Sequence, residues 1–424
     1  MSTTVVSEPW TTTRLGWLFQ PVSDRGHEDE RVLSVYRDHG VIPKDSRTDN
    51  FNRTPENLSN YQLVHPGDLV VNRMKAWQGS LGISEYQGIV SPDYEVLRPT
   101  VPEYDHSFLH SLLRSRALID QYALRSTGIR PSQWRLYWDE MKTIEISLPA
   151  VEQQRAIADY LDRETARIDT LIEEQQRLIE MLRGRRKAVV EQAVFSGLKG
   201  TPTNSNAEPW LPPTPSHWRV VQLGFVSDTV AGYAFPSDGF SADGDHVRLL
   251  RGVNVKPGRI NWTDTVYWDV EVAAVPSEFD LEVGDLVFGM DRPFVGGGVR
   301  VAAISGNDLP ALLLQRVMRI RPNDEAGRGY MRYVMSTDAF FNYLEPLFTG
   351  VSVPHVSEWQ VRKFKMPFPP LDEQTSIAAY LDEQTAKIDT LIEETERFIE
   401  LARERRAALI TAAVTGQIDV REMA

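Results

Sequence analysis

One short stretch of the chain combines side chains that suit contact with a nucleic acid. Arg73 and Lys75 are cations, Trp77 is an aromatic ring and Gln78 is an amide, all within six residues. Cations bind phosphates, and guanidinium and amide groups form hydrogen bonds with base edges. The stretch therefore predicts a binding loop rather than a catalytic one.

Further residues of the same chemical types occur in polar turns elsewhere in the chain. A solvated surface charge explains each of them equally well when it is taken singly. As a set they recur at corresponding places in the two halves of the sequence, which favours two binding faces. The further candidates are Arg130 and Gln133 in the first half, and Arg251, Asn254, Arg292, Arg300, Ser352 and His355 in the second.

Motifs that would indicate catalysis are missing from the sequence. It contains no Gly-x-x-x-x-Gly-Lys-[Ser/Thr] phosphate loop and no Gly-x-Gly-x-x-Gly fingerprint. The eight histidines show no paired ligand spacing, and there is no cysteine, so a thiol nucleophile and a thiolate metal site are excluded. We therefore expect no catalytic residue, no metal and no cofactor bound by this chain.

The composition is that of an ordinary globular protein with an acidic balance. The 424 residues carry a formal net charge of −13, which predicts modest non-specific affinity for nucleic acid and partner subunits that supply positive surface. No apolar run approaches membrane-span length, and the polar N-terminus lacks a signal-peptide core. These features predict a cytoplasmic protein without membrane contact.

A long helical stretch occurs twice, about 220 residues apart. The letters IADYLD at 157–162 return as IAAYLD at 377–382, and IDTLIEE at 168–174 returns unchanged at 388–394. Apolar residues at alternating steps of three and four predict one helix of about 60 Å in each copy. Two surface helices on separate domains are the alternative; two matched apolar faces are more simply buried on one another. The predicted packing residues are Ile168, Leu171, Leu178, Leu182, Ile388, Leu391, Phe398 and Leu409, with a second stripe at Ile172, Ile179, Ile392 and Ile399.

The segments that precede these helices share a series of short motifs. Gly-Asp-Leu-Val occurs at 67–70 and 284–287, Arg-Pro at 98–99 and 321–322, and Thr-Gly at 127–128 and 349–350. Strands are predicted at 69–71, 81–83 and 94–96, and single helices at 107–124 and 331–344. The sequence thus predicts an α+β fold, in which two similar α/β domains are held apart by two long helices that form a coiled-coil-like rod.

At this point the sequence resembles the specificity subunits of Type I restriction–modification enzymes along essentially its whole length. The resemblance rests on LPAVEQQRAI at 148–157, FPPLDEQTSI at 368–377 and AAVTG at 412–416, with VFSG at 194–197 as a small departure in the central copy. It implies target-recognition domains at 10–148 and 218–368, conserved helical regions at 149–199 and 369–424, and a linker at 200–217.

The resemblance also implies a function. Each recognition domain would bind one half of an asymmetric, bipartite site in double-stranded DNA. The two long helices would pack antiparallel and hold the domains apart, so the helix length would set the gap between the halves. Two adenine-N6 methyltransferase subunits would bind the helices, and two ATP-driven translocase–nuclease subunits would join for restriction. S-adenosylmethionine, Mg²⁺ and ATP would be used by those partners.

Two other functions remain open from the residues alone. An enzyme that methylates or cleaves DNA by itself is disfavoured by the missing cofactor motifs. A coiled-coil scaffold with protein-binding end domains and no DNA contact is favoured slightly by the acidic charge.

Overall fold

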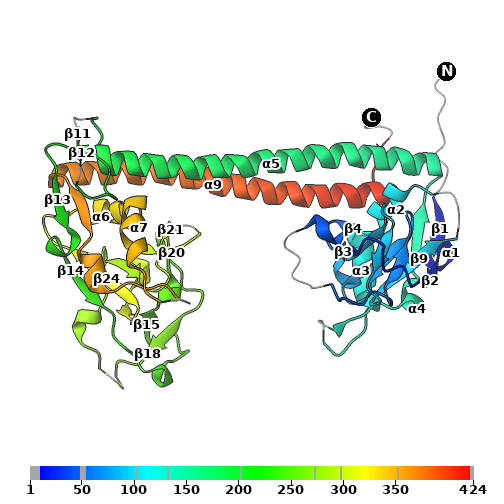
Figure 1. The fold of residues 1–424 in the computed structure, drawn as a ribbon, viewed down its shortest axis with the longest axis horizontal. Coiled ribbons are helices and arrows are strands. Elements are labelled where there is room, and N and C mark those ends of the chain that lie inside the picture. Colours follow the sequence, from blue (N-terminus) through cyan, green and yellow to red (C-terminus); the bar gives the residue numbers. More distant parts are fainter. Residues whose placement is uncertain are drawn as a thin grey trace. The chain divides into compact units, whose positions relative to one another are not determined.

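The computed structural model describes residues 10–47, 54–100, 104–130, 133–200, 203–205, 207–271, 274–296, 298–350 and 353–420. The chain divides into two units. Unit 1 contains residues 1–176 and 396–424, and unit 2 contains residues 177–395. Each unit therefore holds one α/β domain together with a segment of each of two long helices, α5 (Val151–Ser196) and α9 (Leu371–Val414) (Figure 1).

The α/β domain of unit 1, called domain 1, is built on a four-stranded antiparallel sheet in the order β2-β9-β6-β7. Its first and last strands, β1 and β10, pair with each other beside the start of α5. Two further antiparallel pairs are β3–β4 and β5–β8. The elements are β1 (Thr11–Arg14), α1 (Leu15–Leu18), β2 (Phe19–Val22), β3 (Leu33–Tyr36), β4 (Gly40–Pro43), β5 (Gln62–Val64), β6 (Leu69–Asn72), β7 (Leu81–Ile83), β8 (Gly88–Val90), β9 (Tyr94–Pro99), α2 (His106–Leu113), α3 (Arg116–Arg125), α4 (Trp138–Met141) and β10 (Glu145–Leu148).

The α/β domain of unit 2, called domain 2, repeats this plan. Its four-stranded sheet has the order β14-β24-β19-β22, and its first and last strands pair as β13–β25. A three-stranded sheet, β18-β15-β23, and short strand pairs are additions. The elements are β13 (Arg219–Gln222), β14 (Ser227–Ala231), β15 (Val247–Leu250), β16 (Val255–Lys256), β17 (Arg259–Ile260), β18 (Val266–Trp268), β19 (Leu286–Gly289), β20 (Phe294–Val295), β21 (Gly298–Val299), β22 (Val301–Ala303), β23 (Ala311–Leu313), β24 (Val317–Pro322), α6 (Arg328–Met335), α7 (Asp338–Leu344), α8 (Glu358–Arg362) and β25 (Lys365–Phe368).

The strand register shows that the two domains correspond residue by residue in the sheet. Leu69 pairs with Leu97 in domain 1, and Leu286 pairs with Ile320 in domain 2. The repeated Gly-Asp-Leu-Val and Arg-Pro motifs therefore occupy equivalent strands. The predicted fold class, an α+β chain with two similar domains and two long helices, is confirmed.

A buried ion pair explains both repeated motifs of the sheet. The guanidinium of Arg98 donates two hydrogen bonds to Asp68, at 3.1 and 3.0 Å. Arg321 donates to Asp285 in the same way, at 2.7 and 2.8 Å. Both carboxylates are buried, and the hydrogen bonds to them raise the pKa of each arginine. Each pair joins the turn before one central strand (β6 or β19) to the end of the strand beside it in the sheet (β9 or β24).

The predicted single helices at 107–124 and 331–344 are wrong in one respect. Each is two helices, with breaks between α2 and α3 and between α6 and α7. Ser115 and Thr337 stand at the N-cap positions of the second helices, and their extended backbone (φ −66°, ψ 151° and φ −80°, ψ 161°) interrupts the helical turn. Tyr122 also donates from its hydroxyl to the carbonyl of Leu113, which the break leaves accessible (2.9 Å).

A buried glutamine ties each domain to the long helix that follows it. In unit 1 the side chain of Gln154 accepts from the amide of Asp105 (2.9 Å) and donates to the carbonyl of Pro149 (2.9 Å). In unit 2 Gln374 accepts from the amide of Gly327 (2.8 Å) and donates to Pro369 (2.8 Å). Asp105 and Gly327 are the N-cap residues of α2 and α6. The glutamine thus gives a partner to an amide that the first turn of that helix leaves unpaired.

Each long helix is followed by a glycine that packs against a tryptophan of one of the domains. Gly197 follows α5 with φ 68°, and an added Cβ would lie 3.1 Å from the ring of Trp218. Gly416 follows α9 with φ 73°, and its Cβ would lie 3.0 Å from Trp10. Both positions need the left-handed conformation and the missing side chain of glycine.

Within each unit the segments of α5 and α9 lie side by side, and their contacts repeat (Figure 1). In unit 1 Arg406 of α9 bonds to Asp169 of α5 at 2.9 Å. In unit 2 Arg186 of α5 bonds to Asp389 of α9, at 2.8 and 3.2 Å. Asp169 and Asp389 are equivalent in the repeat, as are Arg186 and Arg406, so each helix supplies the acid in one unit and the base in the other.

The predicted packing residues differ in burial. Leu182 and Ile388 are buried, and Ile168, Leu171, Leu178 and Leu409 are half-buried. Leu391 and Phe398 are 48% and 43% exposed, so they are not central to the apolar face, and their assignment to the helix contact stays a prediction. The most buried residues of the two helices follow the second predicted stripe and the positions beside it. Leu391 and Phe398 therefore lie at the edge of the apolar face. Its buried members include Ile172, Ile179, Thr395, Ile399 and Ala402.

The buried glutamines generate a prediction about stability. We expect Gln374→Leu to lower the free energy of unfolding by about 1–3 kcal/mol, because it leaves the Gly327 amide without an acceptor in a buried site. Urea unfolding followed by circular dichroism measures the change. Gln192→Leu, on an exposed position of α5, is the matched control and should stay within about 0.5 kcal/mol of the parent chain. Equal losses in both variants would contradict the assigned role.

Candidate nucleic-acid interface

The two predicted binding loops of domain 1 meet in the structure. The ring of Trp77, in the loop after β6, lies edge-on to the ring of Trp134, with centroids 5.4 Å apart. The amide of Leu136 donates to the carbonyl of Arg73 (2.9 Å), which joins the backbones of the two loops. The candidates whose side chains are exposed around this contact are Lys75, Gln78, Arg130 and Gln133.

Arg73 has a different position from its neighbours in this loop. Its guanidinium donates to the carbonyls of Pro92 (2.8 Å) and Asp93 (3.0 Å) and lies 3.5 Å from Glu95. These bonds hold the turn before β9 against the loop after β6. Its contact with DNA stays a prediction, but most of its donors already have protein acceptors.

Two candidates of domain 2 are buried, and their prediction as direct contacts is wrong. Asn254 is 1% exposed, and its amide donates to the carbonyls of Asn261 and Asp264, both at 2.9 Å. Arg300 is 8% exposed and donates to the carbonyls of Val255 (3.0 Å) and Asp291 (2.7 Å). Burial also lowers the pKa of Arg300. Both side chains supply the hydrogen bonds that irregular backbone needs, a role that residue type alone does not reveal.

Arg251 lies near these two residues and is largely occupied by protein contacts. It pairs with the carboxylate of Asp264 at 2.6 Å and donates to the Asp264 carbonyl at 2.9 Å. It remains a predicted contact residue. Ser352, another predicted residue, lies outside the described part of the chain.

The remaining candidates of domain 2 lie where three loops meet. The amide of Arg292, in the loop after β19, donates to the carbonyl of Pro354 (2.6 Å), and Asp291 forms an isolated bridge with His355. The imidazole of His355 is 2.9 Å from the hydroxyl of Thr349. This arrangement matches domain 1, where Thr127 bridges Arg135 beside the loop after β6.

Sequence reasoning missed one residue at this place, Arg316. It lies in the turn between β23 and β24, and its carbonyl accepts from the amide of Met290 (3.0 Å). Its guanidinium is 3.7 Å from the carboxylate of Asp291, and the side chain is 59% exposed. Its positive φ of 68° is visible only in the structure, although the repeated Arg-Pro motif and the strand predicted at 94–96 could have drawn attention to the turn that precedes the equivalent strand.

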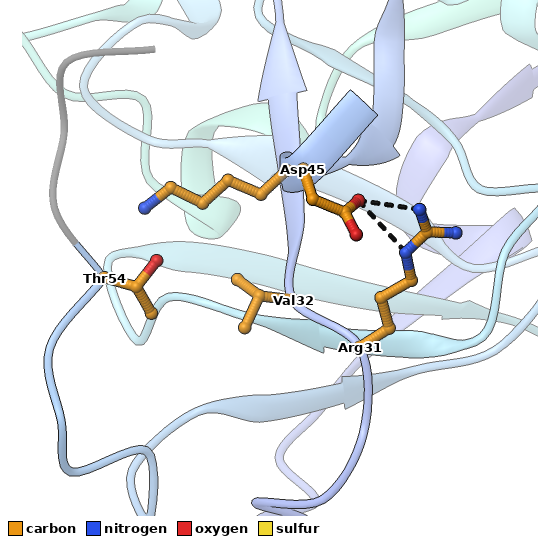
Figure 2. A pocket seen from close by; sticks show the side chains of 5 residues that line it. Arg31, Val32, Asp45 and Thr54 are labelled. Atoms are coloured by element: carbon orange, nitrogen blue, oxygen red, sulfur yellow. Dashed lines mark hydrogen bonds and ion pairs between the residues drawn. The ribbon is translucent and has the colours of Figure 1, made fainter. Parts of the chain in front are cut away.

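A surface pocket elsewhere in domain 1 carries no arrangement that suggests catalysis. Figure 2 shows that Arg31 points at Asp45 across its rim, with nitrogen–oxygen distances of 3.1 and 2.7 Å. The hydrogen bond from Arg31 lowers the pKa of the Asp45 carboxyl. The cavity of about 330 Å³ is also lined by Val32, Lys44 and Thr54, and these side chains form no nucleophile–base pair.

Two other kinds of site are absent from the described residues. Among them, no group of three or more histidine, aspartate or glutamate side chains is arranged to hold a metal ion. None of the helices that the structure describes has the length and apolar character needed to cross a membrane.

The chain is similar to known proteins over most of its length. Residues 215–401 match the model of the type I restriction modification DNA specificity domain. The chain is 25% identical over 372 residues to the MjaVIII specificity subunit of a type I restriction enzyme from Methanocaldococcus jannaschii, covering 86% of this chain and 84% of the relative. It is 29% identical over 251 residues to the EcoAI specificity subunit from Escherichia coli, covering 58% of this chain and 41% of the relative.

Solved structures share the fold. A chain from a structure of the type I restriction–modification system, determined to explain complex assembly and conformational transition, matches with a TM-score of 0.73 at 17% identity, covering 97% of this chain and 98% of that one. The HsdS subunit from Thermoanaerobacter tengcongensis matches with a TM-score of 0.53 at 18% identity and the same coverage. The chain is therefore similar to type I restriction–modification specificity subunits over most of its length, and its residues 215–401 match the DNA specificity domain of such subunits.

Proposed function

We propose that this chain recognises an asymmetric, bipartite DNA site, with one half bound by each α/β domain. The observation that carries the proposal is a repeated scaffold with different loops. Sheet order and register are the same in both domains. The side chains that project beyond the strand ends differ, with Trp77 and Gln78 in one domain and the β20–β21 hairpin in the other. Equal scaffolds with unequal loops suit two different half-sites.

The chemistry would belong to partner subunits. In this proposal two adenine-N6 methyltransferase subunits use S-adenosylmethionine, and two translocase–nuclease subunits use ATP and Mg²⁺. The chain itself positions them on DNA in the cytoplasm and performs no reaction. The net charge of −13 supports this division, because a lone acidic chain binds DNA weakly and gains from basic partners.

Exposed apolar side chains on the long helices support the number of methyltransferase subunits. In unit 1 they are Phe398 and Leu401, beside the half-buried Leu171, and in unit 2 they are Leu391 and Met181, beside the half-buried Leu178. Each residue of one set is equivalent to a residue of the other, 220 positions away. We therefore assign one methyltransferase subunit to each set, since identical partners need matching surfaces.

The first test exchanges one domain. Replacing residues 10–148 with the corresponding domain of another family member should change one half of the methylated site and leave the other half and the spacer intact. The boundaries suit the exchange because β1 and β10 pair with each other, so the insert carries both partners. Mapping of methylated adenines gives the answer. A change in both halves, or in neither, would refute modular recognition.

The second test lengthens the helices. We would insert seven residues in α5 between 176 and 177 and seven in α9 between 396 and 397, which keeps both ion pairs and the apolar period. Seven residues add about 10 Å, equivalent to about three base pairs. We expect the spacer to lengthen by about that amount while both half-sites persist. An insertion in α5 alone is the control and should disrupt the complex. An active double insertion with the original spacer would contradict the proposal.

The third test addresses the methyltransferase surface. We expect Met181→Asp and Leu401→Asp each to weaken binding of one methyltransferase subunit by about tenfold or more, and the double variant to lose both. Native mass spectrometry of the assembled complex counts the subunits. Leu124→Asp, at an exposed leucine of α3 away from the long helices, is the control. Full occupancy in the double variant would place the methyltransferase elsewhere.

A further inference from the structure

Two residues of domain 2 adopt a backbone conformation that side chains disfavour. Among the described non-glycine residues, Arg292 and Arg316 alone have a positive φ, at 44° and 68°. This left-handed region is uncommon for residues other than glycine, asparagine and aspartate. Both positions nevertheless hold arginine. A strained conformation retained for a long cationic side chain suggests that the side chain has a use.

The two arginines lie in neighbouring loops. Met290, two residues before Arg292, donates its amide to the carbonyl of Arg316 (3.0 Å), and Asp291 lies 3.7 Å from the Arg316 guanidinium. That distance is too long for a hydrogen bond but orients the cation. Arg292 itself donates its amide to Pro354, so the loop at 353–356 closes the group.

The donors of these arginines are available, unlike those of their neighbours. Arg300, Arg319 and Arg321 donate to protein carbonyls and carboxylates. Among the described residues, the guanidinium of Arg292 has no protein acceptor, and that of Arg316 has only the ion pair with Asp291. An exposed guanidinium with unused donors can form paired hydrogen bonds with a ligand.

The equivalent positions in domain 1 separate the roles of the two arginines. Counting from the aligned strands β6 and β19, Arg292 corresponds to Lys75, so both domains carry a cation there. Phosphates are the same in every sequence, so a shared cation suits a phosphate. Counting from β9 and β24, Arg316 corresponds to Asp93, an exposed residue of opposite charge. Base edges differ from one DNA sequence to another. A position at which the two domains carry different residues is therefore suited to contact a base edge.

We propose that Arg316 is a specificity-determining residue of domain 2 and recognises a guanine in the major groove, while Arg292 contacts a phosphate. The arginine guanidinium can donate two hydrogen bonds, to N7 and O6 of guanine. No other base presents this pair of adjacent acceptors in the major groove. The inference rests on the proposed function, since it names a contact of the same recognition domain.

The test compares two matched variants in the complex with the cognate methyltransferase. Arg316→Gly and Arg292→Gly each remove the side chain and remain compatible with positive φ, so urea unfolding should show folded chains. Methylated adenines are mapped across a genome for both variants and the parent complex. For Arg316→Gly we expect one guanine of the domain 2 half-site to lose its preference by about 10- to 100-fold, with the domain 1 half-site and the spacer unchanged.

Arg292→Gly should behave differently. We expect an unchanged consensus, weaker binding, and a slope of log affinity against log salt that is shallower by about one. Arg316→Lys provides a second arm, because it keeps the charge and loses the paired donors, and it should also relax the guanine preference.

The outcomes separate this inference from the proposed function. A gapped consensus in the parent complex that persists unchanged in Arg316→Gly and Arg316→Lys would overturn the assignment of Arg316 alone. A shallower salt slope without a change of consensus would likewise overturn it, since that is the behaviour of a phosphate contact. A parent complex that methylates no gapped motif would overturn the proposed function, and this inference with it.

Discussion

The contact between α5 and α9 is the constraint on which the rest of the structure depends. Leucine and isoleucine at helical spacing alone permit several sliding registers. The ion pairs Asp169–Arg406 and Arg186–Asp389 select one of them in each unit. Both ion pairs are partly exposed, so their contribution to the free energy of folding is small. Their main effect is to select the alignment of α5 with α9. Because the acids and bases are equivalent in the repeat, one register satisfies both units.

The domains are attached to this helix pair by buried polar groups rather than by flexible linkers. Gln154 and Gln374 connect the first turn of a domain helix to the first turn of a long helix. Trp10 and Trp218 pack on the glycines that end the long helices. Each domain is attached to the long helices at both its first and its last strand. These two attachments fix its orientation relative to the adjoining segments of α5 and α9. Its loops, which lie beyond the sheet, are then free to differ without altering the attachment.

The repeat made much of this architecture predictable. Period and length identified the long helices, and the Gly-Asp-Leu-Val and Arg-Pro motifs identified equivalent strands because a buried Asp–Arg pair requires them. Side-chain direction was not predictable. Asn254 and Arg300 have the residue types of a DNA contact but satisfy buried backbone groups. Leu391 and Ile392 are adjacent and both apolar, and only packing decides that Leu391 is the exposed one. Arg316 lacked any motif, since its backbone conformation is set by the turn around it.

The most direct test is to express the chain with its cognate methyltransferase subunit and map methylated adenines across a genome by long-read sequencing. Two similar domains with different loops, joined by continuous helices, should produce one asymmetric motif of two short specific halves separated by a fixed, unspecified gap. A well-formed complex that methylates a single continuous motif, or shows no sequence preference, would contradict the account.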